Sequence, residues 1–182
     1  MRRRALLLSA AGVLLVAGCG TEPAAPTPVA VETVAPLPSV SGSPVPVTVP
    51  ATLQFGGKTL DGKPFDATTL AGRPTILWFW APWCATCASE AQSVRDLQEV
   101  YGDRLHFLGI AGLGKNKEMH QFVADLEVGN VTHLDDSAGK IWKKFKITEQ
   151  SLYVVLDRRG KVQSTGYLDD LQLTSLVKSL VA

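Results

Sequence analysis

Cys84 and Cys87 are the residues of this sequence best suited to chemistry, and they stand three positions apart in the run Trp80–Cys87. At the start of a helix that follows a buried strand, two such cysteines can close a small disulfide within the first helical turn. Unpaired backbone N–H groups and the helix dipole favour an anion there, so the Cys84 thiolate should be more stable than that of a free thiol, whose pKa is about 8.5. Cys87 should be more shielded and act as the resolving thiol. The pair would then exchange disulfides by attack, a mixed disulfide and resolution by the second sulfur.

Two other uses of this cysteine pair are a zinc site and a purely structural disulfide. A structural zinc ion takes about four ligands, and the folded part has no further cysteine beyond Cys84 and Cys87. His106, His120 and His133 show no paired ligand spacing, and we expect each to be a surface or partly buried histidine. A structural disulfide would explain the bond but not the aromatic residues that lead up to it.

The run from Trp78 to Cys87 resembles the active site of thioredoxin-like proteins, in particular the TlpA/ResA/DsbE group and the secreted actinobacterial DsbE- and DsbF-like proteins. The resemblance extends over most of 53–181 and includes the hairpin Thr59–Phe65 and the late strand Tyr153–Leu156. Its Trp-Cys-x-x-Cys core is highly specific, and its flanks are moderately so. The resemblance implies a thioredoxin fold, one catalytic cysteine pair and no cofactor beyond the cysteines.

Glu90 lies three residues after Cys87 on the same helix face, where ResA-like proteins carry a glutamate close to the active site. A carboxylate at this place would raise the pKa of a thiol and could accept or deliver its proton. The alternative is an ordinary exposed helix glutamate. Trp78 stands where thioredoxin has a buried aspartate, so proton handling by that route is absent.

Ser151 occupies the position at which thioredoxin-like proteins usually have a cis-proline facing the cysteine pair. A cis bond before a residue other than proline costs about 2.5–4 kcal/mol, so we expect a trans bond here. The Ser151 hydroxyl could then face the sulfurs, and Ser151→Pro should speed turnover or shift the potential without unfolding the domain. The dipeptide Ala85-Thr86 lacks the proline common between such cysteines, and Gln92 stands where a helix proline is usual.

The two tryptophans around the motif have different expected roles. Trp80 should belong to the core, because it ends an apolar strand. Trp83 adjoins the reactive sulfur and, with Pro82, should form an apolar docking surface or groove for polypeptide substrates. Lys143 and Lys144 more simply mark a solvated helix face.

The element that positions the cysteines is the run Thr75–Trp80, whose lack of polar alternation predicts a central strand covered on both faces. The motif should lead into a helix in which Val94, Leu97, Gln98 and Tyr101 are spaced for an amphipathic face, and Gly102 should close it.

The remaining pattern predicts an α/β fold with a mixed central sheet flanked by helices and an N-terminal hairpin extension. The predicted strands are Leu53–Phe55, Thr59–Leu60, Leu105–Ile110, Val131–Leu134, Tyr153–Leu156 and Lys161–Tyr167, with a hairpin turn at Asp61–Gly62. The predicted helices are Lys115–Val128, Ala138–Phe145 and Leu168–Val181.

The chain before this domain reads as an export and anchoring segment. Residues 1–18 have a basic start and an apolar run typical of a secretory signal, the alternative being a retained signal anchor. Val16–Cys19 resembles the bacterial lipobox, which implies that Cys19 is lipidated and anchors the protein in the membrane. Residues 19–50 hold eight of the eleven prolines and should form an extended tether or spacer. The folded domain is expected at 51–182.

The net charge of +1 and the absence of a basic stripe argue against a nucleic-acid partner. We therefore expect a membrane-anchored, extracytoplasmic enzyme that exchanges disulfides with exported cysteine-containing proteins and with a redox partner. The resemblance favours an oxidase. The alternatives are a dedicated reductase of the cytochrome c maturation type and a non-enzymatic binding lipoprotein that keeps the fold.

Overall fold

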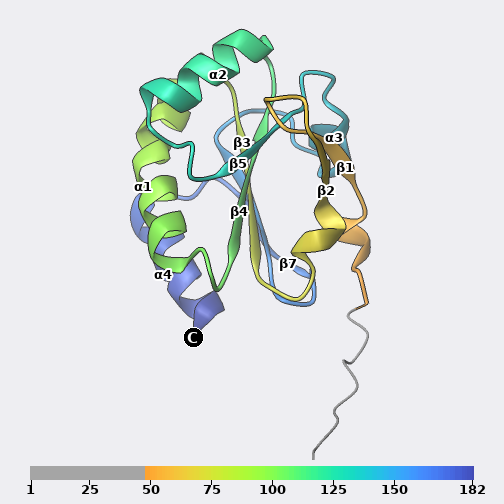
Figure 1. Cartoon of the computed structure of the whole chain (residues 1–182). Coiled ribbons are helices and arrows are strands. Elements are labelled where there is room, and N and C mark those ends of the chain that lie inside the picture. Colours follow the sequence, from red (N-terminus) through yellow and green to blue (C-terminus); the bar gives the residue numbers. More distant parts are fainter. Residues whose placement is uncertain (1–47) are drawn as a thin grey trace, which may run out of the picture. The chain divides into compact units, whose positions relative to one another are not determined.

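The structure, a computed structural model, describes residues 48–182 (Figure 1). The predicted signal at 1–18, the lipidation site Cys19 and all but the end of the tether lie outside the described residues. Within 48–182, no helix has both the length and the apolar character needed to cross a membrane.

A five-stranded mixed sheet in the order β5-β4-β3-β6-β7 forms the centre of the domain. Its middle strand β3 pairs in parallel with β4 and antiparallel with β6. The prediction of a mixed sheet is therefore confirmed. The strands are β3 (Thr75–Trp80), β4 (His106–Ala111), β5 (Thr132–Asp135), β6 (Leu152–Leu156) and β7 (Val162–Gly166).

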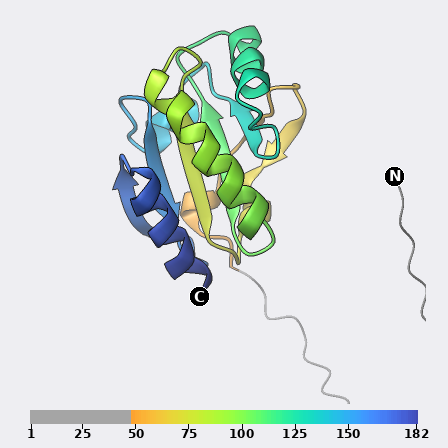
Figure 2. The same ribbon diagram turned by 90° about the vertical axis from the view of Figure 1, so that its left-hand side faces the viewer.

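Helices cover both faces of this sheet, as Figure 1 shows. On one face lie α1 (Ala85–Tyr101), α2 (Asn116–Asp125) and α4 (Asp170–Val181), and Figure 2 looks directly onto α1 with the other two on either side of it. On the opposite face lie α3 (Lys140–Lys144) and the N-terminal hairpin. All four helices were predicted, with somewhat wider bounds.

Every residue of β3 is buried, as expected for a strand covered on both sides. Its side chains alternate: Ile76, Trp78 and Trp80 join the core under α1, whereas Leu77 and Phe79 join the core under α3. The strand ends at Trp80, and residues 81–84 connect it directly to α1. β3 therefore sets the position of the motif and divides the core into two parts.

The N-terminal extension differs from its prediction in detail. The hairpin strands are β1 (Gly56–Lys58) and β2 (Pro64–Asp66), and Gly62 supplies the expected turn with φ of 77°. The predicted strand at Leu53–Phe55 is wrong, because Ala51–Leu53 form the 3₁₀ helix η1 and bury Leu53. The predicted strand at Thr59–Leu60 is also wrong, since Thr59 makes only an isolated bridge to Leu134. Leu53 and Leu60 are buried because they attach short turns to the core, and such burial does not require strand pairing.

Candidate active site

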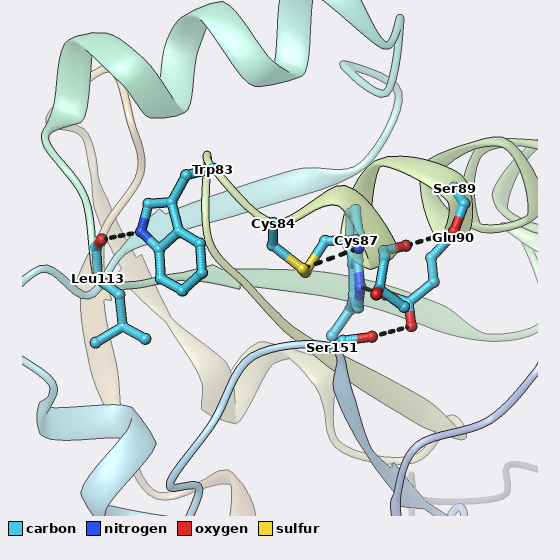
Figure 3. The surroundings of a disulfide bond; sticks show 9 residues. Trp83, Cys84, Cys87, Ser89, Glu90, Leu113 and Ser151 are labelled. Carbon is cyan, nitrogen blue, oxygen red and sulfur yellow. Dashed lines mark hydrogen bonds between the residues drawn. A yellow bond between two sulfur atoms is a disulfide. The ribbon is translucent and has the colours of Figure 1, made fainter.

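The disulfide between Cys84 and Cys87 closes the first turn of α1, with the two Cα atoms 5.2 Å apart (Figure 3). Cys84 is the N-cap residue, in an extended backbone conformation, and its sulfur accepts the Cys87 backbone N–H at 3.0 Å. Cys84 retains 5% of its accessible surface and Cys87 none. Both cysteines are therefore largely buried, and Cys84 is the one that keeps some accessible surface and lines a groove.

Glu90 is buried one turn beyond Cys87, which excludes the alternative of an ordinary exposed helix glutamate. Its Oε2 accepts the Trp78 indole N–H at 2.8 Å, and its Oε1 accepts the Ser151 hydroxyl at 2.5 Å. Burial raises the pKa of Glu90 above its ordinary value; the two hydrogen bonds oppose this rise, and the charge of Asp170 adds to it. The sequence placed Glu90 and Trp78 separately, and the structure joins them.

Ser151 lies just before β6 and has φ of 65°, in the left-handed region. Its backbone N–H donates to the Phe79 carbonyl at 2.8 Å, and its hydroxyl donates to Glu90 rather than facing the sulfurs. The expected outcome for Ser151→Pro stays a prediction, and two features of the structure argue against a folded variant. A proline ring holds φ near about −65° and removes the N–H, so this substitution conflicts with both features.

Trp83 is 60% exposed beside Cys84, and its indole N–H donates to the Leu113 carbonyl at 2.7 Å. A groove of about 410 Å³ runs between α1 and α2 at this point. It is lined by Pro82, Trp83 and Cys84, by the apolar Phe122 and Leu126, and by the acidic Glu118 and Asp125, among others. The structure thus brings Pro82 and Trp83 together with the more accessible sulfur.

Trp80 is fully buried, as predicted, and its indole N–H donates to Nδ1 of His133 at 3.2 Å. The expectation of a surface or partly buried histidine is wrong for His133, which is 5% exposed and whose Nε2 lies 3.1 Å from the Val128 carbonyl. Burial lowers the pKa of His133 to about 4. Its place in the predicted apolar strand Val131–Leu134 was the signal that pointed to burial.

Two further features of this core were not anticipated from the sequence. Tyr153, the β6 neighbour of Trp78, is 1% exposed, and its hydroxyl has no hydrogen-bond partner among the described residues. Asp170, in the first turn of α4, places a negative charge near both Tyr153 and Glu90. Within 48–182, no group of three or more His, Cys, Asp or Glu side chains could hold a metal ion.

Comparison with known proteins identifies consistent relatives. A family model described as Redoxin matches residues 37–180. The soluble secreted antigen MPT53 of Mycobacterium tuberculosis is 36% identical over 115 residues, which cover 63% of this chain and 65% of MPT53. The chain thus spans about 65% of the length of the curated relatives that it matches first.

Two solved structures agree with this result. That of MTB dsbF in its mixed oxidized and reduced forms has a TM-score of 0.69 and 41% identity, and the match covers 73% of this chain and 99% of that one. That of a secreted Mycobacterium tuberculosis disulfide oxidoreductase homologous to E. coli DsbE has a TM-score of 0.65 and 32% identity, with coverage of 71% and 98%. Both likenesses extend over nearly the whole of the described domain.

Proposed function

Since the chain belongs to the Redoxin family, and within it to the thioredoxin-like thiol–disulfide oxidoreductases of the DsbE/TlpA type, we propose that it exchanges disulfides with exported cysteine-containing proteins through Cys84 and Cys87. The observation that carries the proposal is the disulfide at the start of α1, where Cys84 keeps 5% of its accessible surface and lines a groove while Cys87 is fully enclosed. An incoming thiolate can reach only the outer sulfur. Cys84 is therefore the sulfur that exchanges with substrate, and Cys87 is the one that resolves.

In the oxidising direction a substrate thiolate attacks the Cys84 sulfur, and the Cys84–Cys87 bond breaks. Cys87 leaves as a thiolate and takes up a proton, while Cys84 is held in a mixed disulfide. A second substrate thiolate then attacks the substrate's own sulfur in that bond, which releases the substrate disulfide and the Cys84 thiolate. Two electrons pass from the substrate to the cysteine pair. In the reducing direction the same steps run backwards.

Glu90 is proposed as the group that accepts and delivers the Cys87 proton. It is buried one turn along the same helix face, and its pKa is raised by that burial. No cation pairs with it among the described residues, whose salt bridges involve Arg95 and His120. A carboxyl with a raised pKa in an apolar site suits proton exchange with a thiol better than an exposed glutamate would.

Trp83 and Pro82 are proposed to dock the polypeptide substrate. They line the groove that reaches Cys84, and the Trp83 ring is exposed although its indole N–H is already satisfied. Aromatic surface of this kind contributes affinity without demanding one sequence. The acidic Glu118 and Asp125 in the same groove favour substrate segments that carry lysine or arginine.

Location and direction are further parts of the proposal. An extracytoplasmic site of action is supported by the relative described as a secreted antigen and by the solved structure of a secreted oxidoreductase. Membrane attachment through Cys19 rests on the sequence resemblance described above. The oxidase direction rests on the resemblance to DsbE- and DsbF-like proteins and on the position of Cys84 at a helix start, which stabilises a thiolate and thus the reduced form.

The test of the exchange reaction is a pair of single substitutions followed with a cysteine-containing peptide. Cys84→Ser should abolish exchange and form no mixed disulfide, whereas Cys87→Ser should accumulate the mixed disulfide on Cys84. Unchanged exchange in both variants would instead support a binding lipoprotein that merely keeps the fold. A glutathione titration of the wild-type protein then separates the directions. A potential above about −200 mV supports the oxidase, and one at or below about −270 mV supports the reductase.

A further inference from the structure

Ser151 combines an unfavourable backbone conformation with two buried hydrogen bonds. Its φ of 65° lies in the left-handed region, which residues other than glycine rarely adopt. The side chain is 7% exposed, the N–H is bound to Phe79 of the central strand, and the hydroxyl is bound to Glu90. The hydrogen bond to Phe79 and the close packing therefore fix the Ser151 hydroxyl beside the Glu90 carboxylate.

The Glu90 carboxylate depends on that hydroxyl because its other neighbours offer little that favours its charged form. Trp78 supplies a second neutral donor, while Asp170 from α4 repels a negative charge at Glu90. The Tyr153 hydroxyl from β6 lies in the same core without a hydrogen-bond partner among the described residues. Figure 3 shows Ser151 and Glu90 next to each other beside Cys87. Two neutral hydrogen bonds therefore carry the stabilisation of this anion.

We propose that Ser151 is a positioning residue for thiol–disulfide exchange, which keeps the Glu90 carboxylate ionised and oriented one helical turn from Cys87. This inference rests on the proposed function. In the resolving step, the Cys87 thiol gives its proton to the Glu90 carboxylate and its sulfur attacks the Cys84 sulfur of a mixed disulfide. The bond between Cys84 and the substrate breaks, the Cys84–Cys87 bond forms, and the substrate leaves as a thiolate that gains the electron pair.

The loss of the Ser151 hydroxyl has a directional consequence for this step. Without one of its two donors, the buried carboxylate is less stable, so Glu90 holds its own proton to a higher pH. A protonated Glu90 cannot accept the Cys87 proton. The pH below which resolution slows must then rise, while the docking of substrate on the Trp83 side of Cys84 is left unchanged.

The test compares wild-type protein with Ser151→Ala and Ser151→Gly, each also in a Glu90→Gln background. One readout is the Glu90 carboxyl titration by carbon NMR in the disulfide form, which needs no activity. The other is the pH dependence of the rate at which a mixed disulfide on Cys84 is resolved. Both Ser151 variants should raise the Glu90 pKa and move the acid limb of the rate upward by about one pH unit. The affinity for the substrate peptide should stay within about twofold.

The two backgrounds and the two substitutions separate the competing outcomes. In the Glu90→Gln background the acid limb should disappear, and the Ser151 substitutions should have no further effect on it. A shift in the alanine variant that is absent in the glycine variant would trace the effect to backbone conformation and overturn the proposal. An unchanged Glu90 titration in both would overturn it as well. A wild-type protein that fails to exchange disulfides at all contradicts the proposed function instead, and the titration still decides the role of Ser151 toward Glu90.

Discussion

The two cores on either side of the central sheet differ in their polar content. The core under α3 and the N-terminal hairpin is built from apolar side chains such as Leu77, Phe79 and Trp142. The core under α1, α2 and α4 contains the disulfide, and the almost fully buried Glu90 and His133 bond to its tryptophans Trp78 and Trp80. A single strand, β3, supplies alternate residues to both.

A buried carboxylate beside each core makes the contrast sharper. Asp136, at the start of α3, accepts the backbone N–H groups of Lys140, Ile141 and Trp142. Backbone donors at a helix start stabilise an anion wherever the helix forms, so this carboxylate serves the fold. Glu90 instead receives two side-chain donors, which come from β3 and from the loop before β6. The environment of Glu90 therefore depends on particular side chains, which can be substituted without removing the backbone hydrogen bonds of a helix.

The comparison implies that one core sets stability and the other makes stability and reactivity depend on pH. The largest effect should therefore come from the apolar core. Phe79→Ala removes a ring that packs edge-on against Trp142 at 5.9 Å and close to Phe145 at 5.8 Å. We expect a loss of about 3–5 kcal/mol in the free energy of unfolding. Urea denaturation at pH 5 and pH 7 should give the same loss at both values.

The redox potential of a folded Phe79→Ala sample is the control for this prediction, and it should match that of the wild type. A loss of stability that differs between the two pH values would break the comparison, because it would couple the apolar core to a titrating group. So would a change in potential.

The sequence predicted the apolar core and the cysteine helix well for a physical reason. Local patterns can be read from a short window of sequence. A continuous apolar run such as Thr75–Trp80 and a cysteine pair at a helix start are patterns of this kind. The prediction for Leu53–Phe55 was wrong because two apolar residues on either side of a polar one are compatible with a buried turn as well as with a strand. Burial of the turn was decided by contacts with distant residues.

For the core under α1, α2 and α4, called the polar core below, the sequence indicated which residues matter but not which of them contact each other. The positions of Glu90, Ser151 and Trp78 were singled out separately, but the hydrogen bonds among them join residues 12 and 61 positions apart. Such bonds depend on the packing of α1 against β3 and on the left-handed backbone at Ser151, and neither is written in a local pattern. His133 differs in part: the apolar strand Val131–Leu134 indicates its burial, whereas its hydrogen bond with Trp80 joins residues 53 positions apart and has no local signal.

The next effect in size concerns His133 and acid stability. Burial lowers its pKa from 6.5 to about 4 in the folded state. Between about pH 4 and pH 6.5 the unfolded state therefore binds more protons than the folded state does. Stability from this group is fully present above pH 6.5 and is lost as the pH falls to about 4. The difference corresponds to about 3 kcal/mol. Wild-type protein should therefore weaken over this window, whereas His133→Gln, which keeps a donor and an acceptor, should weaken less.

Denaturant melts of both proteins at pH 7, 5.5 and 4 measure this slope directly. A matched control is His120→Gln, which removes a histidine from the exposed side of α2 and tests whether the loss of any imidazole is enough to change the slope. Equal slopes for wild type and His133→Gln would show that His133 accepts a proton without unfolding its surroundings. The polar core would then accommodate a charged imidazole despite its close packing.

The smallest effect is expected from Glu90, and its sign is opposite to that of His133. The folded-state pKa of Glu90 is raised, so the folded protein keeps a proton that the unfolded chain has already released. Stability from this group is fully present below the unfolded pKa and is lost as the pH rises through the folded value. Because the hydrogen bonds from Trp78 and Ser151 oppose the effect of burial, the loss should be small.

Glu90→Gln removes this titration and keeps an acceptor for Trp78 and a polar partner for the Ser151 hydroxyl. Relative to wild type, the variant should gain stability as the pH rises from about 4.5 toward neutrality. In the wild type His133 opposes this trend, because its contribution to stability falls as the pH is lowered. The double variant with His133→Gln should therefore show a nearly flat profile there. A profile as steep as that of the wild type would place the pH dependence outside the polar core and remove the distinction between the two faces of the sheet.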